Sequence, residues 1–190
     1  LTGRPGTIFL DYIMDDDHAI RFVPFKYATN VANTYLLIFG DEYVRFVQDG
    51  AYVVETGKDV TAITQASPGV VTATAHGFSD GDWVRLSGIV GMTELNSRTV
   101  VVTNKTADTF ELEDPFGNNL DTSGFTAYAS GGTASRIYTV ATPYSAEDLE
   151  GLSFFQHRDT IRITSLNFAT RELVRTDATD WDLSTIELGT

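Results

Sequence analysis

The chain has 190 residues, 42% of them hydrophobic, and it contains no cysteine. At roughly 100 to 200 residues per domain, this length allows one large domain or two small ones, with a core that needs no disulfide or metal. The absence of cysteine excludes a disulfide scaffold, a Cys-ligated zinc site and a thiol nucleophile. The net charge of −13 argues against nucleic-acid binding, because an acidic surface repels the phosphate backbone.

No apolar run approaches the roughly 20 residues that a bilayer-spanning helix needs, and no signal peptide is visible. We therefore expect a soluble protein without membrane insertion. The chain begins at Leu1 rather than at Met, which we interpret as a processed chain or a fragment of a larger protein.

The first third of the chain reads as short strands. Residues 19–25, 35–39 and 42–47 are rich in β-branched and aromatic side chains, as half-buried strands are. Gly40-Asp41 and Asp49-Gly50 separate neighbouring runs and predict an antiparallel meander of hairpins. Pro24 should lie at a sheet edge, because proline cannot donate to a β-ladder.

The composition changes between residues 59 and 135, where Thr, Gly, Ala and Ser become frequent. Turn residues such as Ser67-Pro68-Gly69 separate the expected strands. These strands are residues 60–65, 70–75, 82–87, 98–103, 109–113 and 125–129. The segment therefore predicts a small inserted β-sandwich or barrel module.

The strand pattern returns after Ser135, at residues 136–140, 160–164, 172–175 and 182–187. Ser145 followed by Glu147 and Asp148 predicts one short helix of about two turns near residues 145–150, because a serine cap and early acidic residues favour a helix N-terminus. The predicted fold class is all-β. An antiparallel meander or sandwich-like domain of residues 1–58 and 136–190 is interrupted by the inserted module, residues 59–135.

Two clusters of oxygen ligands are candidate metal sites. The first is Asp15-Asp16-Asp17-His18, and the second comprises Asp114, Asn118, Asn119 and Asp121. Consecutive residues point in different directions and seldom converge on one ion, and the second cluster lacks the ligand spacing of an EF-hand. Asp and Asn are also ordinary turn residues, so we favour solvated turns at both places and expect no metal or cofactor.

No catalytic motif is present. His18, His76 and His157 are far apart, and the sequence has no nucleophile elbow, phosphate loop or dinucleotide fingerprint. Acidic residues are too plentiful to nominate a glycosidase pair. We therefore predict that the chain is not an enzyme, although a triad assembled in space from distant residues stays an open alternative.

Trp83 and Phe116 are the candidate interaction surface. Aromatic side chains bind partner proteins or stack on sugar rings when they are exposed. Core packing is the alternative for both residues, and it is the commoner role of aromatics in β proteins.

Several short sequence segments resemble those of a family of bacteriophage and prophage tail proteins, the tail nozzle or tail tubular proteins of short-tailed phages. They include Arg4-Pro5-Gly6-Thr7, residues 20–25, residues 36–46 and residues 141–149. The resemblance implies a structural virion protein that forms a cyclic homo-oligomer, contacts other tail or adaptor proteins and lets DNA pass without specific binding. The implied location is the phage tail or a prophage-encoded particle, and the implied role is a DNA conduit and attachment platform.

The inserted segment resembles a small β module found in phage structural proteins, through residues 74–84 and Gly131-Gly132-Thr133. The alternative hypothesis is a binding module, either an adhesin for host glycan or a docking domain for another virion protein. It rests on the aromatic residues named above.

Overall fold

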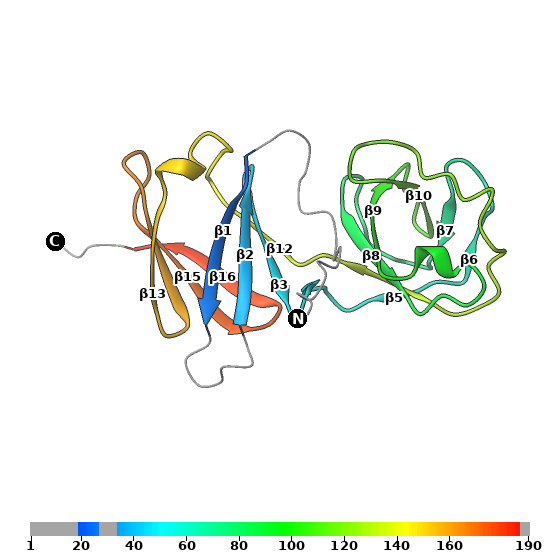
Figure 1. The fold of residues 1–190 in the computed structure, drawn as a ribbon, viewed down its shortest axis with the longest axis horizontal. Helices are drawn as coiled ribbons and strands as arrows, with labels where there is room; N and C mark the ends of the chain where they lie inside the picture. The colour runs from blue at the N-terminus through cyan, green and yellow to red at the C-terminus, as the bar shows by residue number, and fades with distance from the viewer. Residues whose placement is uncertain (1–18, 27–33, 187–190) are drawn as a thin grey trace, which may run out of the picture.

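The computed structural model describes residues 19–26 and 34–186. It confirms the all-β fold class, and every described strand pair is antiparallel. Figure 1 shows two units side by side: a sandwich of two sheets, and a barrel formed by one curled sheet. The structure describes neither the Asp15-Asp16-Asp17-His18 cluster nor Arg4-Pro5-Gly6-Thr7, which lie outside those residues.

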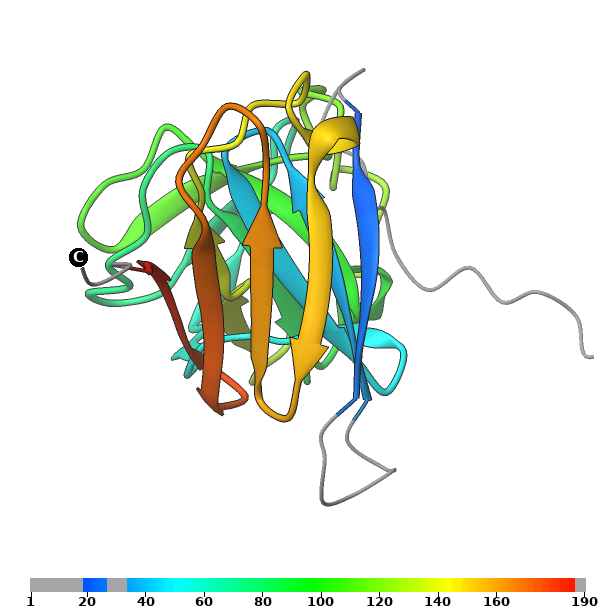
Figure 2. The ribbon, with the colours of Figure 1, turned by 90° about the vertical axis from the view of Figure 1, so that its left-hand side faces the viewer.

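The first sheet of the sandwich has the strand order β1-β2-β3-β12, and β4 also pairs with β3. Its strands are β1 (Arg21–Lys26), β2 (Thr34–Gly40), β3 (Tyr43–Gln48), β4 (Ala51–Tyr52) and β12 (Thr139–Ala141). The second sheet runs in sequence order through β13 (Ser153–His157), β14 (Thr160–Thr164), β15 (Arg171–Asp177) and β16 (Asp180–Thr185). Figure 2 shows the outer face of this second sheet.

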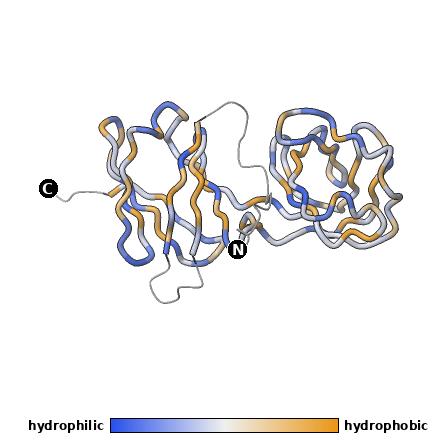
Figure 3. The backbone as a smooth tube through the Cα atoms, in the orientation of Figure 1, coloured by the Kyte–Doolittle hydropathy of each residue, from blue (hydrophilic) through white to orange (hydrophobic). Residues whose placement is uncertain are grey.

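Trp181 lies at the centre of the sandwich core. Its ring stacks on Phe46 at 4.4 Å between centroids and meets Phe25 edge-on at 4.9 Å. The core continues through buried residues of both sheets, among them Leu37, Phe39, Ile161, Ile163 and Leu173. In a strand such as β14, alternate residues point into the core, and Figure 3 shows hydrophobic positions on the strands of both sheets.

The barrel sheet has the order β5-β11-β8-β9-β10-β7-β6. Its strands are β5 (Lys58–Asp59), β6 (Ala62–Ile63), β7 (Val70–Thr72), β8 (Trp83–Ser87), β9 (Arg98–Thr103), β10 (Thr109–Glu113) and β11 (Thr133–Arg136). Both edge strands belong to one continuous segment, in which β5 pairs with β11 and β6 pairs with β7. The sheet therefore closes on itself, which removes the exposed edges that an open sheet would leave.

The barrel interior is filled by side chains. Val100, Val102, Phe110 and Leu112 are fully buried there, together with Leu86. A 3₁₀ turn, η1 (Thr93–Leu95), and a long segment of residues 114–132 cover the ends of the strands. Core packing of this kind leaves the surface as the part of the barrel that other molecules can reach.

Several predicted elements differ from the structure. The helix near residues 145–150 is only a 3₁₀ turn, η2 (Leu149–Gly151), preceded by a turn in which the Asp148 carboxylate accepts from the Ser145 N–H and hydroxyl at 3.0 and 2.7 Å. Residues 125–129 form no strand, while β5 and β13 were not predicted. Within residues 19–26 and 34–186, no helix is long and apolar enough to span a membrane.

Candidate functional site

The most elaborate arrangement of side chains lies at the junction, which we define as residues 53–59 and 133–138 and the groups that pack on them. The two chain segments that connect the sandwich and the barrel run antiparallel and bond to each other. The Glu55 N–H donates to the Arg136 carbonyl at 2.8 Å, and the Tyr138 N–H donates to the Val53 carbonyl at 2.9 Å. A hydrogen-bonded ribbon of this kind resists bending far better than two separate linkers.

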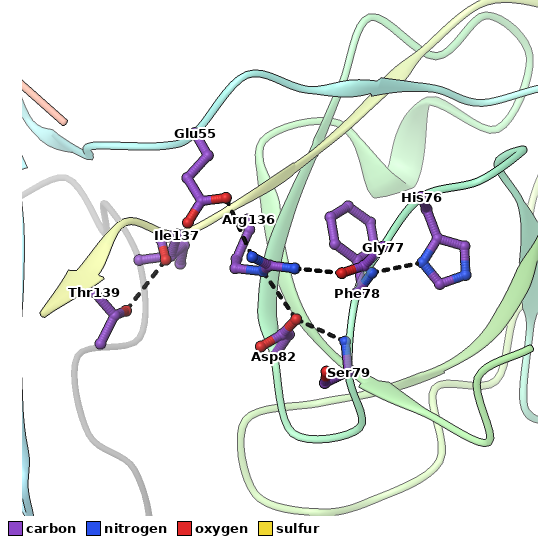
Figure 4. Close-up of polar contacts among 9 residues, drawn as sticks. All are labelled: Glu55, His76, Gly77, Phe78, Ser79, Asp82, Arg136, Ile137 and Thr139. Atoms are coloured by element: carbon purple, nitrogen blue, oxygen red, sulfur yellow. Dashed lines mark hydrogen bonds and ion pairs between the residues drawn. The ribbon is translucent and has the colours of Figure 1, made fainter. Parts of the chain in front are cut away.

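Arg136 ties the ribbon to the barrel. Its Nε donates to the Asp82 carboxylate at 2.9 Å, Nη1 to Glu55 at 3.3 Å and Nη2 to the Gly77 carbonyl at 2.6 Å (Figure 4). The guanidinium also lies 5.5 Å from the centre of the Phe78 ring. All three nitrogens are in use, so the rigid fork of the arginine fixes the ribbon, β8 and the 76–78 loop relative to one another.

A second contact joins the barrel to the outer face of the first sandwich sheet. The Arg45 guanidinium lies 3.9 Å from the centre of the Trp83 ring and 4.3 Å from that of Tyr43, so it is held between an aromatic of each unit. Ile38 and Ile137 complete a buried cluster with Trp83 and Tyr52. Cation–π contacts strengthen when they are desolvated, and Arg45 is only 6% exposed.

Tyr138 links the junction to the far sheet of the sandwich. Its hydroxyl accepts a hydrogen bond from the Trp181 backbone N–H at 2.9 Å, across the gap between β12 and β16. Burial raises the pKa of Tyr138 and outweighs the Trp181 hydrogen bond, which lowers it. The phenol therefore stays neutral at ordinary pH.

A polar hollow of about 560 Å³ opens beside the Arg136 contacts, lined in part by Glu55, Lys58 and Thr179. His76 reaches its wall but is 2% exposed: Nδ1 accepts the Phe78 N–H at 3.0 Å, and Nε2 faces the Thr109 carbonyl at 3.3 Å. Both ring nitrogens thus bond to backbone groups of the barrel, and the proton lies on Nε2. This is the pattern of a structural histidine rather than a general base.

Among the described residues, the other candidate histidine does not line this hollow. His18 lies outside the described residues, and His157 ends β13 in the sandwich. Within the part of the chain that the structure describes, no three His, Cys, Asp or Glu residues come together in a metal-binding arrangement. The hydrogen bonds, ion pairs and packing of the junction can hold the two units in a fixed arrangement.

The second oxygen-ligand cluster is a turn. Asp114 Oδ1 accepts the N–H groups of Phe116 and Asn118 at 2.9 and 3.0 Å, and Asp121 Oδ1 accepts the Ser123 N–H at 2.9 Å. Burial raises the pKa of Asp114, but these hydrogen bonds from Asn118 and Phe116 outweigh it and lower the pKa overall. Each carboxylate thus forms its own Asx turn, in which the Asp side chain accepts a backbone N–H a few residues further along the chain. Both turns stabilise the loop.

The two predicted interaction residues lie in different environments. Trp83 is 5% exposed and packed in the junction, whereas Phe116 is 53% exposed on the loop after β10. The Trp83 ring is therefore covered by the chain itself and offers no surface aromatic patch. Binding through Phe116 remains a prediction.

Arg45 and Arg136 are the functional residues that sequence reasoning missed. The partners of Arg136 lie 54 to 81 positions away, so no local spacing connects them. Arg45 did leave a signal, because it stands between the buried residues Val44 and Phe46 and therefore faces the opposite side of its strand. That side contacts the barrel rather than solvent.

Comparison with known proteins matches the barrel to one family. The model of the ubiquitin-activating enzyme E1 FCCH domain matches residues 66–137, which run from just before β7 to just after β11. The match covers the larger part of the barrel and leaves the sandwich outside it. The barrel is therefore similar to a domain that occurs in a class of activating enzymes.

Curated relatives agree with that match. Ubiquitin-like modifier-activating enzyme 1 of Oryctolagus cuniculus is 33% identical over 103 residues, and ubiquitin-like modifier-activating enzyme 7 of Homo sapiens is 34% identical over 106 residues. Each alignment covers 52% of this chain and 9% of the relative. The chain thus spans about a tenth of the length of these relatives.

A solved structure, the phage phi92 endosialidase, aligns with 90% of this chain and 30% of its own. Its TM-score is 0.30 and its sequence identity is 14%. At that TM-score, the likeness says nothing about fold or function.

These findings correct the resemblance to tail nozzle proteins. The matching family and the curated relatives belong to ubiquitin-activating enzymes, so the predicted phage tail component, the DNA conduit and the virion location are wrong. The predicted partners, a cyclic homo-oligomer with tail or adaptor proteins, are wrong for the same reason, as is the alternative of a host-glycan or virion-docking module. The sequence segments that carry the resemblance are largely strand patterns. Alternating burial of side chains produces such patterns in any β-sandwich.

Proposed function

We propose that the barrel is a protein-docking domain of the E1 FCCH type, carried in a fixed orientation by the sandwich, and that neither unit is catalytic. One observation carries this proposal: the family match of residues 66–137 falls on a closed, filled barrel, which offers a surface rather than an interior site. The relatives are named for activating ubiquitin-like modifiers, so the partner class is a ubiquitin-like protein.

The exposed apolar side chains of the barrel support the proposal. Phe116 and Val90 are 53% and 55% exposed, on loops at the ends of strands. Exposed aromatic and aliphatic residues on rigid loops are the usual anchors of protein interfaces. Asp114 Oδ1 accepts the Phe116 N–H at 2.9 Å, so the Phe116 side chain lies on an ordered loop.

The test is a titration of the isotope-labelled chain with ubiquitin, followed by amide chemical shifts. We expect concentration-dependent shifts confined to the barrel, and weaker binding by about tenfold in the Phe116→Ser variant, which corresponds to the loss of one interface anchor. The matched control is Phe155→Ser, which removes a 66% exposed phenylalanine from the sandwich and should leave the affinity unchanged. Shifts limited to the sandwich, or no shifts at millimolar ubiquitin, would contradict the proposal.

A further inference from the structure

Among the described residues, the sandwich has an open side at which two edge strands, β1 and β13, lie next to each other without pairing. Each strand is at the end of its sheet. A hollow of about 300 Å³ between them is lined by residues of both strands, including Phe22, Pro24 and Phe154. Side-chain packing alone therefore does not close this side, and unpaired edges of this kind invite a strand from another molecule.

Gln156 of β13 bridges the two edges. Its Nε2 donates to the Lys26 carbonyl at 2.7 Å, and its Oε1 accepts the Lys26 N–H at 3.2 Å. Nε2 also donates to the Arg158 carbonyl at 2.8 Å, which holds the carboxamide in place. The Gln156 carboxamide thus bonds to both the N–H and the C=O of Lys26. A residue of a paired neighbouring strand would make the same two bonds.

Two further features protect the same edge of β1. Pro24 is two residues before Lys26, so its nitrogen faces the same open side and has no hydrogen to donate. At the start of the strand, Arg21 Nη1 donates to the carbonyls of Leu149 and Glu150, both at 2.8 Å. Natural sheets use proline and inward-pointing polar residues at their edges to prevent strand addition.

We infer that the Gln156 carboxamide is a latch that occupies the β1 edge and, with Pro24, keeps a second copy of this chain from adding a strand there. This inference is independent of the docking role proposed above. It predicts that the site for strand addition is already present and that, within residues 19–26 and 34–186, side chains cover it.

Amide hydrogen exchange tests the latch directly. In Gln156→Met, which keeps the side-chain volume, and in Gln156→Asn, which keeps the carboxamide on a shorter stem, the Lys26 amide should exchange about fivefold faster, because it loses one hydrogen bond of about 1 kcal/mol. The Ile163 amide in the neighbouring strand should keep its protection, which shows that the variants are folded. The control is Gln65→Met, which removes a similar bond, from Nε2 to the Phe125 carbonyl at 2.7 Å, in the barrel.

Native mass then tests the consequence. The double variant Pro24→Val with Gln156→Met should double its mass relative to the unmodified chain as concentration rises, since both protections of the edge are gone. An unchanged Lys26 exchange rate in both single variants, or a double variant whose mass equals that of the unmodified chain at every concentration, would overturn the inference.

Discussion

Individual carboxylates fix the loops of the barrel, and Glu94 gives the clearest example. Its Oε1 accepts the Thr126 N–H at 2.9 Å and the Thr126 hydroxyl at 3.0 Å, which joins η1 to the long loop before β11. The backbone hydrogen bond from Thr126 is the largest cause of the lowered pKa of Glu94. The two residues are 32 positions apart, so no local pattern of residues indicates this contact.

The lowered pKa of Glu94 determines how its contact with Thr126 depends on pH. Because the folded-state pKa lies below the ordinary value, the contact is complete above that value and is lost as the pH falls through the folded pKa. The Thr126 amide chemical shift, followed by NMR, should therefore titrate with a midpoint below that of an ordinary glutamate. In Glu94→Gln this titration should vanish, whereas a midpoint at or above the ordinary value in the unmodified chain would refute the assignment.

At the scale of elements, the Thr122 hydroxyl is one of the groups that hold the long 114–132 segment onto the barrel. Thr122 is fully buried, its hydroxyl lies 2.7 Å from the Thr64 carbonyl and 3.0 Å from that of Ala66, and it accepts the Ala66 N–H at 3.2 Å. Thr122→Val has nearly the same shape but removes the hydroxyl from the Thr64 carbonyl and the Ala66 N–H, while the Ala66 carbonyl keeps the Thr122 N–H at 2.9 Å. We expect a loss of about 1–3 kcal/mol in the free energy of unfolding, measured with urea.

The matched control for that change is Thr164→Val, at an exposed position at the end of β14. Its effect should stay within about 0.5 kcal/mol, as for most surface substitutions. Equal effects of the two variants would mean that the Thr122 hydrogen bonds do not hold the segment.

Strand patterning made most elements predictable, and the exceptions have physical reasons. Residues 98–103, 109–113 and 160–164 form strands as expected, because the first and third segments are rich in β-branched residues and the second alternates apolar with polar ones. β13 was missed because it has no β-branched residue and places Phe155 on the solvent face. In β2, Leu37, Ile38 and Phe39 are all fully buried, since Leu37 and Phe39 face the sandwich core while Ile38 faces the barrel.

At the scale of the whole molecule, the candidate site could not be predicted, because it is made by segments that are distant in sequence. Arg136 meets Glu55 and Asp82 only after the ribbon has formed, and Arg45 meets Trp83 only after the barrel lies on the first sheet. The contacts combine ion pairs, a cation–π pair and apolar burial. Together they should make the sandwich and the barrel tumble as one body.

Residual dipolar couplings of the backbone amides test this claim most directly, because they report the orientation of each unit in one common frame. We expect the amides of β2 and β3 and those of β8 and β9 to fit a single alignment tensor in the unmodified chain. In the double variant Arg136→Met with Trp83→Leu, the two units should need separate tensors. Two tensors of different magnitude in the unmodified chain would contradict a barrel held in a fixed orientation.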